Sequence, residues 1–181
     1  MATNTQGGLS SDFQGPVSIA IGGAYRLGSA KLHLTGEWFA PVDEFVVLPA
    51  EPFVGQTSGD LIDTAVTREL AEVFNIAIGI ENRFTEKLIA YGSFRTDRSG
   101  FEAGSEAPVP IGDWDIYHVA GGATFTIGSS EITAGAIVSY GDSTTGRVFE
   151  PFGGGQTSPD DEIQVKYFRF SFILGFNFAF K

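Results

Sequence analysis

Three things are scarce in this sequence of 181 residues: cysteine is absent, basic residues are few, and long hydrophobic runs are missing. Without cysteine, the chain has neither disulfides nor thiolate metal ligands. No stretch approaches the ~20 consecutive apolar residues of a transmembrane helix, which argues against a helical membrane protein. Lysine and arginine total 11 against 22 acidic residues, and the resulting net charge of −11 argues against nucleic acid as a partner.

What the chain does contain is alternation, most clearly in its last residues. Bulky apolar side chains occupy every second position there: Phe168, Phe170, Phe172, Leu174, Phe176, Phe178 and Phe180. Because the side chains of a strand point alternately to its two faces, this segment predicts a strand with one continuous apolar face. It is about long enough to cross a bilayer at a tilt. The aromatic-rich end is similar to the closing strand of bacterial outer-membrane barrels.

Six earlier segments alternate in the same way, and 17 Phe and 24 Gly fit lipid-facing aromatics opposite small inward residues. The seven predicted strands are 16–27, 30–39, 73–84, 87–96, 115–127, 131–140 and 163–180. Two-residue turns at 28–29, 85–86 and 128–129 alternate with long, Pro/Gly-rich, acidic loops at 40–72, 97–114 and 141–162.

Short turns at one end and long loops at the other are typical of outer-membrane proteins. The sequence therefore predicts an all-β fold, an antiparallel transmembrane β-barrel over residues 16–181 in the bacterial outer membrane. We expect the barrel to contact the lipid bilayer and lipopolysaccharide. Residues 1–15 are expected to form a flexible or extracellular segment before it.

An odd number of strands raises the question of closure. Bacterial barrels usually have an even number of strands, and an open edge in lipid costs several kcal/mol for each unpaired backbone group. We therefore expect either that further strands precede this chain in a larger barrel or that a partner subunit supplies them. The first is the simpler account.

Three strings carry a family resemblance: PVSIAIGGAYRLGSAKLHLTGEWFAPVDEF, FNIAIGIENRFTEKLIAYGSFRTD and WDIYHVAGGATFTIG. They resemble the C-terminal half of the FadL/TodX-like outer-membrane family, whose members transport long-chain fatty acids and aromatic hydrocarbons. The resemblance covers roughly residues 14–181 and implies a hydrophobic-compound transporter. A fourteen-stranded family fold would leave seven strands for this half. No binding residue is carried over from the family.

Charged and imidazole side chains fall on the predicted inward face in mixed signs. The candidate lumen or gate residues are Arg26, His33, Glu37, Arg83, Arg95, His118, Lys166 and Arg169. One interpretation is a salt-bridged network that braces a plugged lumen, because buried charges must be paired. The other is a polar gate that meets a carboxylate-bearing ligand. His33, His118 and Glu37 lack the spacing of metal ligands, so we expect no metal and no cofactor.

The long loops contain an internal echo, since EPFVGQTSGD at 51–60 recurs as EPFGGGQTSPD at 150–160. We expect both copies to form turns that cap the barrel, with Phe53 and Phe152 as apolar plugs; a paired surface for a partner is the alternative. After the first copy, apolar residues at helical spacing predict a short amphipathic helix within 60–72.

Enzymatic motifs are missing: the sequence has no nucleophile elbow, His-rich metal motif or phosphate-binding loop. The glycine pairs at 22–23 and 121–122 sit inside predicted strands, where we expect them to relieve crowding. The predicted function is therefore not enzymatic but passive transport of hydrophobic small molecules, fatty-acid-like or aromatic. The alternative is a structural barrel that binds a partner protein through its acidic loops. A soluble, lipocalin-like carrier is disfavoured, because it would need the phenylalanine face to point inward.

Overall fold

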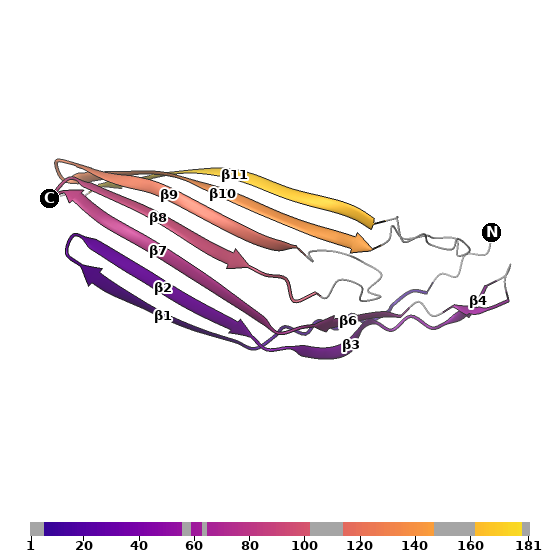
Figure 1. Cartoon of the computed structure of the whole chain (residues 1–181). Coiled ribbons are helices and arrows are strands. Elements are labelled where there is room, and N and C mark those ends of the chain that lie inside the picture. Colours follow the sequence, from indigo (N-terminus) through magenta and orange to yellow (C-terminus); the bar gives the residue numbers. More distant parts are fainter. Residues whose placement is uncertain (1–5, 56–58, 63–64, 102–113, 147–161, 179–181) are drawn as a thin grey trace.

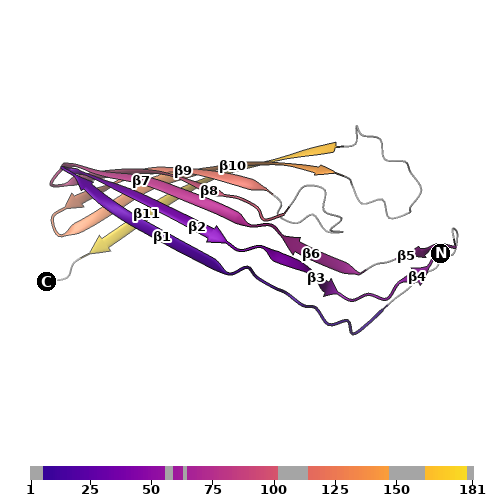
Figure 2. The ribbon, with the colours of Figure 1, turned by 60° about the horizontal axis from the view of Figure 1, so that its bottom comes forward.

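The fold is that of a computed structural model, which describes residues 6–55, 59–62, 65–101, 114–146 and 162–178. Its main body is one antiparallel sheet of seven strands, curved along its width (Figures 1 and 2). In sheet order these are β1 (Ser18–Leu27), β2 (Ala30–Phe39), β7 (Val73–Thr85), β8 (Leu88–Asp97), β9 (Asp115–Ile127), β10 (Ser130–Gly146) and β11 (Glu162–Phe178). The prediction of an all-β, antiparallel structure is confirmed.

The strands begin and end close to their predicted limits, with one main exception. Strand β10 runs to Gly146, six residues past the predicted end at 140, and it pairs with β11 along its whole length. Residues 141–146 show little alternation, so only pairing with a distant strand defines them. At the opposite end of the sheet, Gly28 and Gly128 occupy the tight turns with φ of 60° and 64°, a backbone region that favours glycine.

The sheet has two chemically different faces. The register aligns the bulky alternating residues of all seven strands, and we call the side they share the apolar face. Its exposed members are Ile19, Ile21, Tyr25, Leu27, Leu32, Leu34, Trp38, Phe74, Ile78, Ile80, Phe84, Phe94, Tyr117, Val119, Phe125, Ile127, Val138, Tyr140, Phe168, Phe170, Phe172, Leu174, Phe176 and Phe178. The opposite side, called the polar face, carries small, polar and charged residues. The sheet therefore has no packed layer against its apolar face within the described residues.

The described residues of the predicted long loop at 40–72 include four strands, and two of them lie where the helix was predicted, within 60–72. Strand β3 (Val42–Leu48) pairs with β6 (Val66–Leu70), and β4 (Phe53–Val54) pairs with β5 (Leu61–Ile62) farther out. The helix prediction is wrong because the apolar residues at helical spacing include the β-branched Ile62 and Val66, which here pair with Phe53 of β4 and Leu48 of β3. None of the described residues forms a helix that is long and apolar enough to cross a membrane.

This hairpin extends beyond the end of the sheet where β2 stops and β7 starts (Figure 1). The N-terminal segment follows it, since Asp12 N donates to Val47 O at 3.0 Å and Gln6 exchanges two hydrogen bonds with the Glu51 backbone. The few buried apolar side chains among the described residues, Phe45, Val47 and Val73, lie in or next to this extension. The Arg68 guanidinium adds a cation–π contact, 4.5 Å from the centre of the Phe101 ring.

The sheet has two free edges. Strand β1 pairs only with β2, and β11 pairs only with β10, among the strands that the structure describes. Closure into a barrel is therefore not observed in this part of the chain and stays a prediction.

Candidate functional site

The polar face is best followed as cross-strand rows, because paired residues on neighbouring strands stand side by side. The row that we call the arginine row runs Thr35, Ala77, Arg95, His118, Ser139 and Arg169 from β2 to β11. Three of the predicted gate residues, Arg95, His118 and Arg169, thus come together although they lie on three different strands. No other described row holds three of the predicted gate residues.

Direct contacts hold the middle of the arginine row in place. His118 Nδ1 lies 2.8 Å from Ser139 Oγ, and His118 Nε2 lies 3.6 Å from Asp97 Oδ2. Asp97 Oδ2 is also 3.4 Å from Arg95 Nη2. A serine, a histidine and an aspartate therefore follow one another, but with the ring nitrogens exchanged relative to serine hydrolases, in which the serine contacts Nε2 and the aspartate contacts Nδ1. Ser139 is only 4% exposed, which leaves a substrate little access to its hydroxyl, so these contacts fix the imidazole rather than activate a nucleophile.

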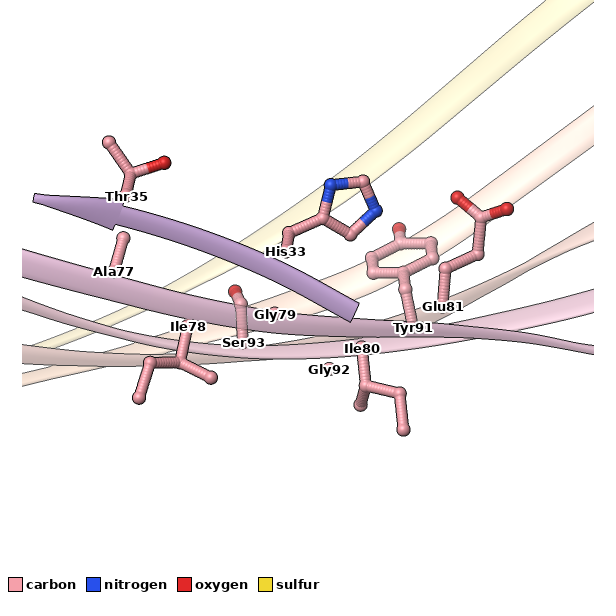
Figure 3. Close-up of a pocket in the computed structure, with 10 residues that line it drawn as sticks. All are labelled: His33, Thr35, Ala77, Ile78, Gly79, Ile80, Glu81, Tyr91, Gly92 and Ser93. Carbon is pink, nitrogen blue, oxygen red and sulfur yellow. The ribbon is translucent and has the colours of Figure 1, made fainter. Parts of the chain in front are cut away.

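The next row, which we call the glycine row, carries no carboxylate, ammonium or guanidinium group. It runs Ala24, His33, Gly79, Ser93, Ala120, Ile137 and Ser171. A recess of about 280 Å³ opens above Gly79 and is lined by residues of β2, β7 and β8. Figure 3 shows His33, Ser93, Tyr91 and Glu81 on one side of the sheet, with Ile78 and Ile80 pointing to the other.

A third row, nearer the tight turns, combines charge with a tyrosine. It runs Arg26, Lys31, Glu81, Tyr91, Gly122 and Gly135. The Tyr91 ring lies against the two glycines: a Cβ placed on Gly122 would be 2.5 Å from Tyr91 Oη, and one on Gly135 would be 2.9 Å from it. The prediction that glycines relieve crowding is confirmed for Gly122. It is wrong for its neighbour Gly121, whose Cβ would meet nothing closer than 3.7 Å.

The remaining gate candidates are dispersed over the polar face. Glu37 stands opposite Asn75, and Arg83 stands opposite Ile89. Arg26 and His33 belong to the two other rows described above. The candidates therefore do not form one ring. Among the described residues, no group of three His, Cys, Asp or Glu side chains is placed to hold a metal ion.

One gate candidate lies on the wrong face. Lys166 pairs with Asp142 and shares its side of β11 with Phe168, two residues further on. Since side chains alternate with a period of two, Lys166 belongs to the apolar face, beyond the last aromatic residue. The prediction that it faces the lumen together with Arg169 is wrong, because the two residues are separated by an odd number of positions.

The two predicted loop plugs differ in what the structure says of them. Phe53 lies in the small β4–β5 hairpin, where it pairs with Ile62 and is half-buried. Phe152 falls outside the described residues. Capping of a barrel by these two side chains stays a prediction.

The sequence did not reveal Ser139 and Asp97 as partners of His118. The tight turn at 128–129 fixes the register of β9 on β10, so the pairing of His118 with Ser139 was within reach of the sequence. The Asp97 contact depends on the register between β8 and β9, and the long connection between those strands does not fix that register. The packing of the Tyr91 ring against two glycines left a clearer signal in the sequence. Glycine at 122 and at 135 interrupts two otherwise regular strands.

Comparisons with known proteins add no relative: no family model matches the chain, and neither a curated protein nor a solved structure matches it.

Proposed function

We propose that this sheet is part of the wall of a β-barrel in the bacterial outer membrane, and that the barrel lets small hydrophobic molecules pass. The apolar face is the observation that carries the proposal. Ile21, Phe168 and Phe172 are 77%, 69% and 63% exposed, and similar side chains cover this face from β1 to β11. Soluble monomers rarely expose an apolar patch larger than roughly 300–600 Å². A face of this extent needs an apolar environment.

Strand length supports the same proposal. Strands β1, β2 and β8 each have 10 residues, and roughly 9–11 residues cross a bilayer when tilted. Strands β10 and β11 each have 17 residues and would extend beyond the apolar layer. Lys166 and Asp142, past the last aromatic residue of these strands, are then positioned outside it.

The direction of the edge strands limits how such a barrel closes. Seven antiparallel strands make β1 and β11 run in the same direction, so direct pairing between them would be parallel. If a second copy in the same orientation closed the barrel, β11 of each copy would pair with β1 of the other. Both of these pairings would also be parallel. An odd number of further strands between β1 and β11 restores antiparallel pairing throughout, and we propose this arrangement.

The polar face supports a passage for hydrophobic molecules rather than for ions. Apolar side chains interrupt it at Ile89, Ile137 and Ile173, and Ile173 is 45% exposed there. Glycine and alanine lie between the charged rows. An amphipathic or apolar solute thus meets apolar surface on the polar face as well. Membership of the FadL/TodX-like family stays a prediction from the sequence.

Adjacent residues of β11 allow a matched test of which face contacts lipid. Phe172→Arg places a charge on the apolar face, and Ile173→Arg places the same charge on the polar face. We expect the first variant to lose stable insertion into lipid vesicles, because arginine at the bilayer midplane costs about 2–4 kcal/mol. The second should insert like the parent chain. Equal insertion of both variants would contradict the assignment of the two faces.

Transport itself is tested in outer-membrane vesicles from cells that make the protein. Vesicles holding the parent chain should take up a fluorescent fatty-acid analogue and an aromatic dye faster than vesicles lacking it. If uptake is unchanged although the protein is inserted, transport is refuted. The proposal that the sheet is part of a barrel wall in the membrane is not affected by that result.

A further inference from the structure

We infer that the recess above Gly79 binds an uncharged, hydroxyl-bearing small molecule with a compact apolar body. This inference rests on the proposed function, since it assumes that the polar face lines the passage. It adds to that function a defined site and a ligand chemistry. The recess measures about 280 Å³, and roughly 150 Å³ is enough to hold benzene. It therefore has room for a ligand of about that size.

The first observation that supports a ligand site here is the glycine at position 79. Glycine inside a strand weakens it and often marks a place where a ligand or another backbone approaches. Packing within the sheet does not require glycine here, because a Cβ at this position would lie at ordinary contact distance, 3.7 Å from the His33 and Ser93 Cβ atoms and from Gly92 O. Gly122 and Gly135 differ, since their missing side chains make room for Tyr91. An empty space above Gly79 is left unexplained by the fold alone.

Glycine by itself does not define the site, because Gly92 and Gly121 on the apolar face also have room for a Cβ. What distinguishes Gly79 is the set of polar groups around it. His33 and Ser93 flank it in the same row, and Glu81 and Tyr91 stand in the next row (Figure 3). Gly92 and Gly121 have only apolar neighbours in their row, among them Ile80 and Ala136.

The hydrogen-bonding capacity of these groups is unused. No hydrogen bond or ion pair joins the side chains of His33, Ser93 or Glu81 to another described residue, whereas His118 is held by Ser139 and Asp97. An imidazole offers a donor and an acceptor, and a serine hydroxyl offers both. A ligand hydroxyl, which also donates and accepts, complements this pair.

The charges around the recess argue for a neutral ligand. The glycine row has no carboxylate, ammonium or guanidinium group. In the row toward the tight turns, Lys31 stands opposite Glu81 and Arg26 lies beyond it, and Arg83 follows along β7. On the other side of the recess, Arg95 stands in the neighbouring arginine row. Glu81 is the one formally charged residue among those that line the recess, and Lys31 stands opposite it. Arg95 is 3.4 Å from the carboxylate of Asp97, and Arg26 and Arg83 do not line the recess. The charges nearest the recess are thus matched in sign, so they select neither a carboxylate nor an amine.

The test uses the full chain in lipid vesicles and para-fluorobenzyl alcohol as the probe, observed by fluorine NMR. Fluorobenzene lacks the hydroxyl and para-fluorobenzoate carries a charge, so both serve as comparison ligands. The parent chain should bind the alcohol saturably, more tightly than either comparison ligand. Gly79→Ala should weaken binding about tenfold, because the added methyl group would stand at the floor of the recess where the ligand would lie, a loss that corresponds to 1.4 kcal/mol. Gly121→Ala, a control on the opposite face at a residue that does not line the recess, should bind like the parent chain.

His33→Ala supplies a second variant that tests the hydroxyl contact. It should lose about fivefold in affinity for the alcohol and leave fluorobenzene binding unchanged. The inference is overturned if an inserted parent chain shows no saturable binding, if Gly79→Ala binds like the parent, or if fluorobenzene or the benzoate binds as tightly as the alcohol. A chain that fails to insert into the vesicles would instead refute the membrane proposal, and the inference would fall with it.

Discussion

Replacing Gly122 by alanine should unfold this sheet more easily than any other single-methyl change in β9. The added Cβ would lie 2.5 Å from Ala134 O and 2.5 Å from Tyr91 Oη. The first neighbour is backbone held in the β9–β10 ladder, so it yields little. The second is a ring that is able to swing away, but only by leaving its place over Gly122 and Gly135.

The magnitude follows from these two neighbours. Expelling the Tyr91 ring returns roughly 100 Å² of surface to solvent, about 2.5 kcal/mol at ~25 cal/mol per Å². Keeping the ring in place costs about 1–3 kcal/mol in overpacking instead. We therefore expect Gly122→Ala to lower the free energy of unfolding by about 2–3 kcal/mol.

The assay is urea unfolding of the chain in detergent micelles, followed by the fluorescence of Trp38 and Trp114. With a slope of about 2 kcal/mol per molar urea, the midpoint should fall by roughly 1 M. Gly121→Ala is the matched control, because its nearest atom would be Tyr91 O at 3.7 Å. It should be neutral, or stabilising by up to about 1 kcal/mol.

A double variant separates the two clashes. Tyr91→Ala combined with Gly122→Ala removes the ring but leaves the contact with Ala134 O, so the two losses should be less than additive. The reasoning is refuted if Gly122→Ala unfolds at the same urea concentration as Gly121→Ala, or if the losses simply add.

Two further predictions concern the histidines and the turns. His118→Ala should lower the free energy of unfolding by about 1–3 kcal/mol, because it leaves the buried Ser139 hydroxyl without its partner. His33→Ala should stay within about 0.5 kcal/mol of the parent chain, and equal losses for both would contradict the difference in their contacts. Gly28→Ala should cost about 1–2 kcal/mol, because its φ of 60° is unfavourable for alanine. Gly23→Ala, in open space, should cost nothing, and thermal unfolding of the two variants side by side measures this difference.

Alternation was sufficient to predict the main sheet. Because one face of each strand is apolar throughout, a period of two reveals both the strand and the direction of its side chains, as for β9 at 115–127. The same rule identifies Ile89 as an apolar residue on the polar face. The same rule places Lys166, three positions from Arg169, on the opposite face of β11, so its prediction as a lumen residue did not follow the period of two.

Features that depend on contacts between distant residues were not predictable. The segment at 60–72 has apolar residues at helical spacing, but its described strands pair with β3 and β4 instead. The extension of β10 to Gly146 depends on β11 in the same way. Of the partners of His118, Ser139 follows from the tight turn between β9 and β10, whereas Asp97 depends on the register of β8 on β9, which the long connection between those strands does not specify.

The order of the strands also bears on how this sheet is assembled. Each pairing in it joins strands that are neighbours along the chain, except the pairing of β2 with β7. The residues between those two form their own hairpin, β3 with β6, which shortens the loop that must be closed. Strand pairing can therefore propagate through local contacts alone, which favours rapid folding for a β-protein of this size. In the closed barrel proposed above, the pairing of the two edge strands with further strands would be the encounter between distant parts, so we expect closure to be the slow step.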